Sequence, residues 1–293
     1  MKGHISKGII LMLFVVGLGL LCYPTISNWY GRSHQIDAID AYKEQVEQAN
    51  HSQLDRLREE ASQYNEGLFG NAIITDPFST SEVVKENRKY NELLNLSQDG
   101  IMGYVQIPSI EVYLPIYHGT EEDVLKKGAG HLMNSSLPIG GEGSHTVITG
   151  HTGLPFATLF TNLDQVEEGD YFFLYVLEER LVYQVDQIKV VEPENTEDLV
   201  IEQKKDYATL VTCTPYGVNS HRLLVRGVRV VDWEKEEAAS VVVDEKQEGV
   251  LTEGLWNLLL PGCLLVVVIV VVMKYSKNTK RRDVHEEKSR NDN

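Results

Sequence analysis

The sequence predicts a mainly β domain in the middle of the chain, built as a barrel or a sandwich. Short apolar runs recur between residues 100 and 232, turns rich in Gly, Pro and Asp separate them, and few helical patterns interrupt them. Charged, helix-prone residues precede this domain, and a long apolar segment lies near each end of the chain. The expected strands are residues 102–107, 112–116, 146–149, 171–176, 181–188, 208–212 and 223–231.

The first apolar segment, residues 8–22, carries no charge and follows Lys2 and Lys7. This pattern is typical of a signal peptide or a signal anchor, and the lack of a clear A-x-A cleavage site favours an uncleaved anchor. We therefore assign residues 1–26 to an N-terminal signal anchor.

Residues 27–99 are expected to form a helical extension ahead of the β-rich domain. Its second half is less regular than its first and contains Asp76-Pro77-Phe78, a tripeptide that alone indicates only a turn. Between residues 37 and 64, apolar residues recur at roughly helical spacing, namely Ala41, Val46, Ala49, Leu54, Leu57 and Ala61.

The β-rich domain, residues 100–232, is followed by an acidic stretch without an apolar face, residues 233–253, which we interpret as a linker. Residues 254–274 approach the apolar length of roughly 20 residues that spans a bilayer. The tail, residues 275–293, is basic at its start, and basic flanks stay in the cytoplasm. Because lysines also precede the first apolar segment, both termini are predicted to be cytoplasmic and the β-rich domain extracellular.

The formal net charge of the chain is −16, which argues against a nucleic-acid partner because such binding depends on Lys and Arg neutralising phosphates. The sequence has no zinc-type cysteine spacing and no phosphate-binding glycine loop. Acidic residues gather between 164 and 170, but such a cluster is more typical of a solvated turn. We therefore predict neither a metal nor a cofactor.

Cys213 is the only cysteine outside the apolar segments, because Cys22 and Cys263 lie within them. A disulfide framework is not expected, so Cys213 is either a small buried core residue or a reactive thiol. An apolar run ends at Cys213, a turn follows, and Arg222 opens the next β-type run.

If these two runs pair as a hairpin, Cys213 and Arg222 face each other, about 4.5–5.5 Å apart at Cβ. A cationic neighbour favours the nucleophilic thiolate, and the same guanidinium can stabilise negative charge on an attacked carbonyl. The arrangement suits acyl transfer through a thioester.

His151 lies between two glycines directly after the expected strand 146–149. A histidine titrates near neutral pH, so it can transfer protons when a thiol attacks an amide and an amine leaves. The chain has nine histidines, and an ordinary surface-loop position is the alternative for His151. His131 could line the same groove, although a structural role is favoured for it.

Three motifs in combination resemble the signature of the sortases of Gram-positive bacteria: Thr209-Leu210-Val211-Thr212-Cys213, the downstream Arg222, and the upstream Thr149-Gly150-His151. The resemblance covers residues 100–232 and implies an eight-stranded β-barrel. It also implies that Cys213 is the nucleophile and His151 the general acid and base. Arg222 would bind the substrate and stabilise the oxyanion.

Finer features resemble class C, the pilus-assembling sortases. That class carries an N-terminal lid with an Asp-Pro-aromatic motif, here Asp76-Pro77-Phe78, and tends to have a C-terminal membrane segment. The resemblance implies a membrane-anchored cysteine transpeptidase that cleaves an LPXTG-like sorting signal and joins pilin subunits through lysine isopeptide bonds. Its partners would be such pilins and the membrane, with cell-wall peptidoglycan as a further candidate.

Other interpretations stay open at this point. A sortase that attaches single proteins to peptidoglycan would use a cross-bridge amine as acceptor, and a plain cysteine peptidase would use water. A membrane-tethered adhesin or scaffold without catalysis is a third possibility. The lid motif and the second membrane segment weigh against the first, and the combination of Cys213, His151 and Arg222 weighs against the last.

Overall fold

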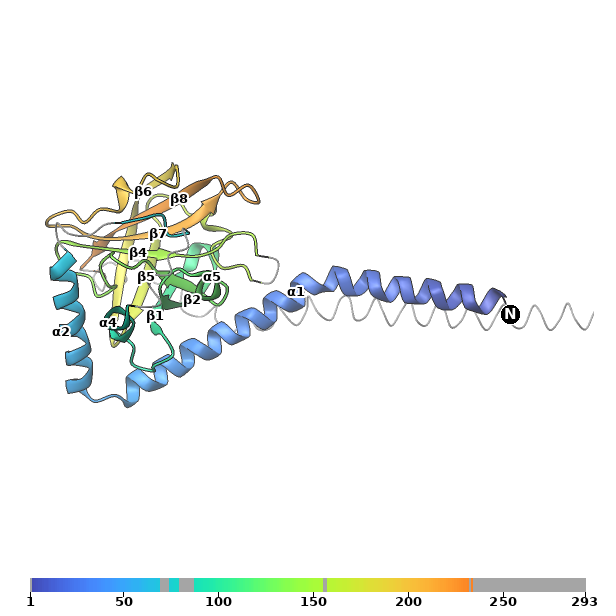
Figure 1. Ribbon diagram of the computed structural model, residues 1–293, viewed down its shortest axis with the longest axis horizontal. Helices are drawn as coiled ribbons and strands as arrows, with labels where there is room; N and C mark the ends of the chain where they lie inside the picture. Colours follow the sequence, from blue (N-terminus) through green and yellow to red (C-terminus); the bar gives the residue numbers. More distant parts are fainter. Residues whose placement is uncertain (1, 69–73, 79–86, 155–156, 232, 234–293) are drawn as a thin grey trace, which may run out of the picture. The chain divides into compact units, whose positions relative to one another are not determined.

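The computed structural model describes residues 2–68, 74–78, 87–154, 157–231 and 233. Within them, eight strands close into one barrel, in the neighbour order β1-β2-β3-β4-β7-β8-β6-β5 (Figure 1). The architecture is therefore the barrel and not the sandwich. The strands are β1 (Ile101–Ile107), β2 (Val112–His118), β3 (Ala129–His131), β4 (Ser144–Thr149), β5 (Tyr171–Val176), β6 (Glu179–Val191), β7 (Asp206–Thr214) and β8 (His221–Val230).

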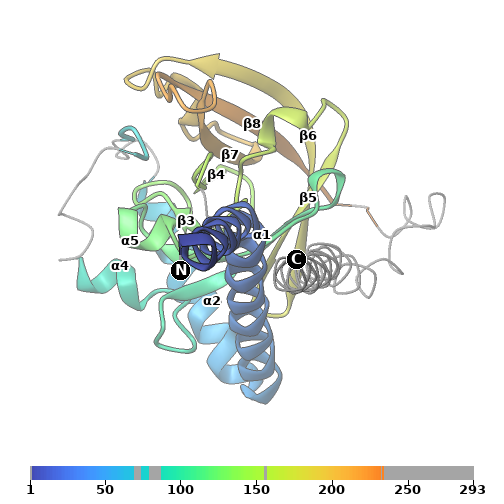
Figure 2. The same cartoon turned by 90° about the vertical axis from the view of Figure 1, so that its right-hand side faces the viewer.

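Among these strands, β2 pairs with β3 and β4 with β7 in parallel, and the other pairs are antiparallel. Figure 2 shows β4, β7, β8 and β6 side by side, in the order that their hydrogen bonds define. Fully buried residues such as Ile148 of β4 and Leu210 of β7 belong to the main core. Since side chains alternate along a strand, the neighbours of these residues face the other side of the barrel wall.

All seven strands that the pattern predicts are present. The pattern does not predict β3, because three residues are too few to show a period. Position in the barrel makes this segment a strand, since it pairs with β2 on one side and with β4 on the other.

The helical extension contains two long helices, α1 (Lys2–Gln48) and α2 (His51–Leu68), where the pattern predicts one helix-prone zone. Asn50 separates them. Its Oδ1 accepts hydrogen bonds from the backbone N–H of Gln53 at 2.9 Å and from the Ser52 hydroxyl at 2.8 Å, a side-chain cap that begins α2. The shorter helices are α4 (Arg88–Glu92) and α5 (Glu122–Leu125), with 3₁₀ turns at Pro108–Ile110, Leu163–Gln165 and Glu197–Leu199.

The second half of α1 packs on the barrel. The Tyr42 hydroxyl accepts a hydrogen bond from the Leu177 N–H at 2.8 Å and lies 3.2 Å from the Met102 carbonyl, to which it donates. The apolar contacts join Ile39, Tyr42, Val46, Ile101 and Tyr104. The buried face of α2, formed by Leu54, Leu57 and Ala61, belongs to the main core.

The chain divides into two compact units. One of them, Tyr30–Ser240, contains the barrel, and the other includes Met1–Trp29, the first part of α1. Among the described helices, the stretch Met12–Gln48 is long and apolar enough to cross a membrane, by length and composition. This N-terminal helix suggests membrane anchoring, and it continues without a break through residue 26. The predicted C-terminal span, residues 254–274, and the tail, residues 275–293, lie outside the described residues.

Candidate active site

The β7–β8 hairpin carries the predicted thiol and the predicted cation. Cys213 pairs in register with Arg222, and Thr214 pairs with His221 next to the connecting turn. The cross-strand arrangement expected from the sequence is therefore present. Cys213 is a half-buried free thiol, and the Arg222 side chain is 10% exposed.

His151 follows β4 at the same edge of the barrel. Because β4 and β7 run parallel, with Thr149 opposite Val211, their carboxyl ends emerge together. The Gly150 N–H donates to the Val211 carbonyl at 3.0 Å, and the Gly150 carbonyl accepts from the Thr212 hydroxyl at 2.7 Å. These bonds hold the residue before His151 against the strand that leads to Cys213.

Close packing defines the loop after β4. A Cβ on Gly150 would lie 2.6 Å from the ring of Phe160, and a Cβ on Gly153 would lie 3.2 Å from the ring of Tyr216. The carbonyl of His151 accepts a hydrogen bond from the Phe160 N–H at 3.1 Å. A Cβ at position 150 would therefore clash with Phe160, and Gly153 has φ +74°, a backbone conformation that favours glycine.

Residues 74–78, which contain the predicted lid motif Asp76-Pro77-Phe78, contact both of these regions. Asp76 forms a bidentate ion pair with Arg222, in which Oδ1 accepts from Nε at 2.7 Å and Oδ2 from Nη2 at 2.8 Å. The centre of the Phe78 ring lies 5.6 Å from that of the His151 imidazole and 5.0 Å from the Arg222 guanidinium carbon. Asp76 thus pairs with Arg222, and the ring of Phe78 lies against His151 and Arg222.

The same segment packs on an apolar surface made by Leu132, Val147, Leu199, Val211 and Leu224. Ile74 and Phe78 lie against this surface. The Thr196 hydroxyl donates a hydrogen bond to the Ile74 carbonyl at 3.3 Å. Residues 74–78 therefore rest on the barrel wall and on the loop between β6 and β7.

The electrostatics of Cys213 are those of a protected thiol. Burial raises the pKa of Cys213, the Arg222 cation lowers it, and the Asp76 carboxylate raises it again. The cation acts in the direction that the sequence predicts, but burial outweighs it. The neutral thiol is therefore the favoured form at neutral pH while Asp76 is in place.

The His151 imidazole is also neutral in this state. Burial lowers its pKa, while Glu122 raises the pKa and Lys126 lowers it. A neutral imidazole can accept a proton, so His151 is in the form that a general base requires.

His131 is structural, in agreement with the favoured interpretation. It is fully buried, with Nδ1 2.7 Å from the Tyr90 hydroxyl and Nε2 2.9 Å from the Ser136 carbonyl. Burial lowers the pKa of His131 to about 3, so the neutral ring joins α4 to β3 and to the loop that follows β3.

The acidic residues between 164 and 170 form a capped turn, in which the Glu167 N–H donates to Asp170 Oδ2 at 3.1 Å. Within the described part of the chain, no group of three or more His, Cys, Asp or Glu side chains could hold a metal ion.

Sequence reasoning does not predict the contributions of Thr212 and Thr196. Thr212 is 3% exposed in an otherwise apolar run, and a buried hydroxyl next to Cys213 is a signal that it bonds to something nearby. Thr196 carries no such signal, because it lies in a polar loop and its partner, Ile74, is 122 residues away.

A thiol, a neutral imidazole and a guanidinium thus lie at one edge of the barrel. This set suits nucleophilic acyl transfer, in which the imidazole takes the thiol proton and the guanidinium stabilises an oxyanion. The Asp76 carboxylate occupies the two donors of Arg222 that would serve an incoming carbonyl or carboxylate.

Comparison with known proteins agrees with this arrangement. A Sortase domain model matches residues 105–230. Sortase C of Streptococcus pneumoniae, whose crystal structure is reported to give insight into catalysis and pilin substrate specificity, is 46% identical over 67% of this chain and 97% of that chain, with a TM-score of 0.60. Sortase C1 of GBS Pilus Island 1 is 43% identical over 67% of this chain and 92% of that chain, also with a TM-score of 0.60.

A curated relative, sortase D of Bacillus subtilis (strain 168), is 31% identical over 131 residues, which are 44% of this chain and 63% of that protein. The match thus spans a little less than two thirds of the length of that relative. The chain belongs to the sortase family, whose members are cysteine transpeptidases. Class C sortases are the structural neighbours that it resembles at 43% to 46% identity.

Proposed function

We propose that this chain is a pilus-assembling transpeptidase, which cleaves an LPXTG-like sorting signal and joins pilin subunits through lysine isopeptide bonds. The observation that carries the proposal is the position of residues 74–78 on the candidate site. Asp76 and Phe78 occupy Arg222 and His151, the two side chains that a sorting signal would need. A segment of the chain that blocks the site in this way is the lid expected of class C. The pilin association of the two similar sortases supports the same assignment.

In the proposed mechanism, His151 removes the proton from the Cys213 thiol, and the thiolate attacks the carbonyl carbon of the Thr–Gly bond. Arg222 donates hydrogen bonds to the developing oxyanion. The C–N bond then breaks, the glycine amine leaves with the proton held by His151, and a thioester remains on Cys213. The neutral ε-amine of a pilin lysine attacks this thioester, giving an isopeptide bond and releasing the thiol.

The lid motif, Asp76-Pro77-Phe78, must leave before this chemistry can begin. Its departure would free the donors of Arg222 and open the apolar surface on which Ile74 and Phe78 rest. It would also remove the Asp76 carboxylate, which raises the pKa of Cys213. Lid opening would therefore expose the site and favour the thiolate in one step.

The proposed location of this chemistry is the extracellular face of the membrane, with both termini in the cytoplasm. The apolar first part of α1 is the N-terminal anchor of this arrangement. Residues 254–274 would form the second anchor, on the strength of their apolar length and the basic residues that follow. LPXTG-type proteins are then the substrates, and pilins are the particular substrates proposed.

The function is tested with an Asp76→Ala, Phe78→Ala variant of the Tyr30–Ser240 unit and an LPXTG peptide. Mass spectrometry should show an acyl adduct on Cys213, and Cys213→Ala in the same background should show none while keeping its melting temperature. Three acceptors are then compared, namely a pilin peptide with a central lysine, a peptidoglycan cross-bridge amine, and water.

A lysine-linked product formed in preference to the others supports pilus assembly. A product with the cross-bridge amine alone would identify a sortase that anchors proteins to the cell wall. Cleavage without any joined product would identify a peptidase, and activity of Cys213→Ala would remove Cys213 as the nucleophile.

A further inference from the structure

The loop between β6 and β7, residues 192–205, forms one wall of the site and is held to the barrel at buried positions. Its residue Leu199 is 2% exposed and belongs to the apolar surface beneath residues 74–78. Its residue Thr196 bonds to the carbonyl of Ile74. The position of this loop therefore decides both the shape of the apolar surface and the support of the lid.

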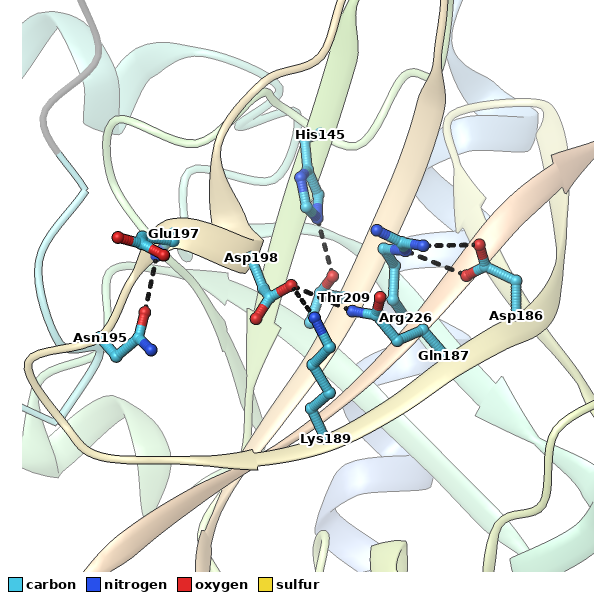
Figure 3. A network of polar contacts seen from close by, with 9 residues as sticks. All are labelled: His145, Asp186, Gln187, Lys189, Asn195, Glu197, Asp198, Thr209 and Arg226. Carbon is cyan, nitrogen blue, oxygen red and sulfur yellow. Dashed lines mark hydrogen bonds and ion pairs between the residues drawn. The ribbon is translucent and has the colours of Figure 1, made fainter.

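A buried histidine, His145, joins this loop to the barrel. Figure 3 shows its hydrogen bond to Thr209. His145 of β4 is 1% exposed, with Nδ1 2.9 Å from the Val200 carbonyl and Nε2 2.7 Å from the Thr209 hydroxyl. Burial lowers the pKa of His145 to about 4, so the ring is neutral and carries one N–H. A carbonyl can only accept, so Nδ1 donates to Val200, and Nε2 then accepts the hydrogen bond of Thr209.

Thr209 opens the Thr-Leu-Val-Thr-Cys run that ends at Cys213. Its hydroxyl is buried and fixes the orientation of the imidazole, because it can donate only to the unprotonated nitrogen. Thr209 lies on the strand that carries Cys213, and its bond to Nε2 leaves Nδ1 of His145 as the nitrogen that donates to the loop.

A second set of hydrogen bonds attaches the loop to β6 closer to the protein surface (Figure 3). Asp198, the neighbour of Leu199, accepts from Gln187 Nε2 at 3.2 Å and from the ammonium of Lys189 at 2.5 Å. Both donors are on β6, so the loop is held from β4 and from β6. A loop fixed on two sides presents Leu199 as part of a preformed surface.

We propose that His145 is a positioning residue for substrate binding at the apolar surface beneath residues 74–78, acting through its hydrogen bond to the Val200 carbonyl. The proposal rests on the proposed transpeptidase function. His145 does not contact Cys213, His151 or Arg222 in the interactions described above, so it acts on binding. Without the Nδ1–H donor, the carbonyl next to Leu199 is left unpaired and the loop moves to satisfy it in water. The apolar surface then loses one of its members.

Two variants of similar size separate this role from simple structural support. In His145→Asn, the new side-chain amide nitrogen would lie near the place of Nδ1, so this variant keeps the donor to Val200. The longer side chain in His145→Gln reaches the place of Nε2, so that variant keeps the partner of Thr209 and loses the donor to Val200. Both variants remove the imidazole from the same buried site.

The measurement is the steady-state cleavage of a fluorogenic LPXTG peptide in the Asp76→Ala, Phe78→Ala background. We expect His145→Gln to raise KM about five- to tenfold with kcat nearly unchanged, as loss of one hydrogen bond to a buried carbonyl implies. His145→Asn should stay close to the parent. The matched control is Asp186→Asn, which breaks the bidentate pair of Arg226 in the same network without touching the loop, and its KM should not change.

Equal KM values for the folded His145→Asn and His145→Gln variants would overturn the proposal, and so would a fall in kcat at constant KM. If His145→Gln does not fold, His145→Leu takes its place, because it removes the donor to the Val200 carbonyl and keeps a buried side chain at this site. A KM equal to that of the parent for folded His145→Leu would then overturn the proposal.

A second readout keeps this inference separate from the proposed function. With the natural lid present, a thiol reagent should label Cys213 several-fold faster in His145→Gln than in His145→Asn, because the loop supports Ile74 through Thr196. If the parent forms no acyl adduct, the proposed function fails. The labelling comparison would still support or contradict the role of His145.

Discussion

Arg222 and its partner Asp76 affect the pKa of Cys213 in opposite directions. The Arg222 cation lowers the pKa of Cys213, while the Asp76 carboxylate that pairs with it raises that pKa. The pair is charge-assisted and bidentate, and the side chains of Arg222 and Asp76 are only 10% and 16% exposed. A single residue thus holds the closed state and, in the proposed mechanism, stabilises the oxyanion after opening.

Arg222→Lys tests this second role. A lysine keeps the charge but lacks the planar fork of donors. In the Asp76→Ala, Phe78→Ala background, we expect peptide turnover to fall by a factor on the order of 10²–10³, as for loss of an oxyanion donor. The control is Arg226→Lys, since Arg226 lies on the same strand and forms a bidentate pair with Asp186. An unchanged kcat in Arg222→Lys would reduce Arg222 to a barrel residue.

Among the elements, the segment 74–78 lies outside the hydrogen-bonded strands of the barrel. It is held by the ion pair to Arg222, the ring of Phe78 on His151, the bond from Thr196 and a small apolar contact. A surface segment outside the sheet opens at a lower free-energy cost than the strands beneath it. In the proposed mechanism, opening of this segment therefore needs no change in the barrel.

Replacing Asp76 and Phe78 with alanine should increase the labelling rate of Cys213 by a bulky thiol reagent, roughly ten- to a hundredfold. This range follows from losing hydrogen bonds to a charged group and from the scaling of reactivity with the open fraction. The melting temperature should change little. Asp186→Ala, which breaks the other bidentate Arg–Asp pair, should not alter labelling. Equal rates in the lid variant and the parent would show that these residues do not gate the thiol.

The same lid should set the pH dependence of Cys213 reactivity. Asp76 raises the pKa of the thiol, so removing its charge with Asp76→Asn should lower that pKa. Only the thiolate reacts, so the midpoint of the pH profile for labelling by iodoacetamide should move to lower pH. A midpoint that stays in place or moves upward would contradict the electrostatic part of the closed state.

At the scale of the whole molecule, α1 combines an apolar stretch suited to a membrane with a segment that packs on the barrel. In α1, the apolar side chains of Met12, Leu13 and Leu21 are exposed, and those of Ile39, Tyr42 and Val46 are buried against the barrel. The same helix, Lys2–Gln48, thus contains the apolar stretch that suggests membrane anchoring and a segment that packs on the barrel. For the C-terminal side, the sequence supports a linker and a second span.

The predicted topology places both termini in the cytoplasm. A reporter fused after Asn293 should be cytoplasmic, and one inserted near Lys246 should be external, because basic residues follow the second apolar segment. Protease added to intact protoplasts should degrade the barrel. Protection of the barrel from the protease would mean that the orientation is reversed.

Much of the fold can be predicted from the sequence, because strands and hairpins depend on patterns of residues that are close together in the chain. Alternating apolar residues predict seven of the eight described strands, and the residue types between Cys213 and Arg222 predict that these two residues pair across a hairpin. The hairpin is a local structure, so the facing positions of Cys213 and Arg222 follow from the turn between them. The three-residue strand β3 has no period of its own, and its pairing depends on neighbours already in place.

Contacts between distant residues determine the rest. The ion pair of Asp76 with Arg222 joins residues 146 positions apart, and the resemblance to class C suggests it only because the family motif is known. The net pKa shift of Cys213 depends on the burial of the thiol and on the nearby Asp76 carboxylate, which no residue type reveals. The link from Thr209 through His145 to Val200 also belongs to the folded chain, since a buried hydrogen bond forms only when the barrel brings its partners together. Local patterns therefore predict the strands and the reactive side chains, whereas burial and long-range pairing decide whether the site is closed and what holds its walls.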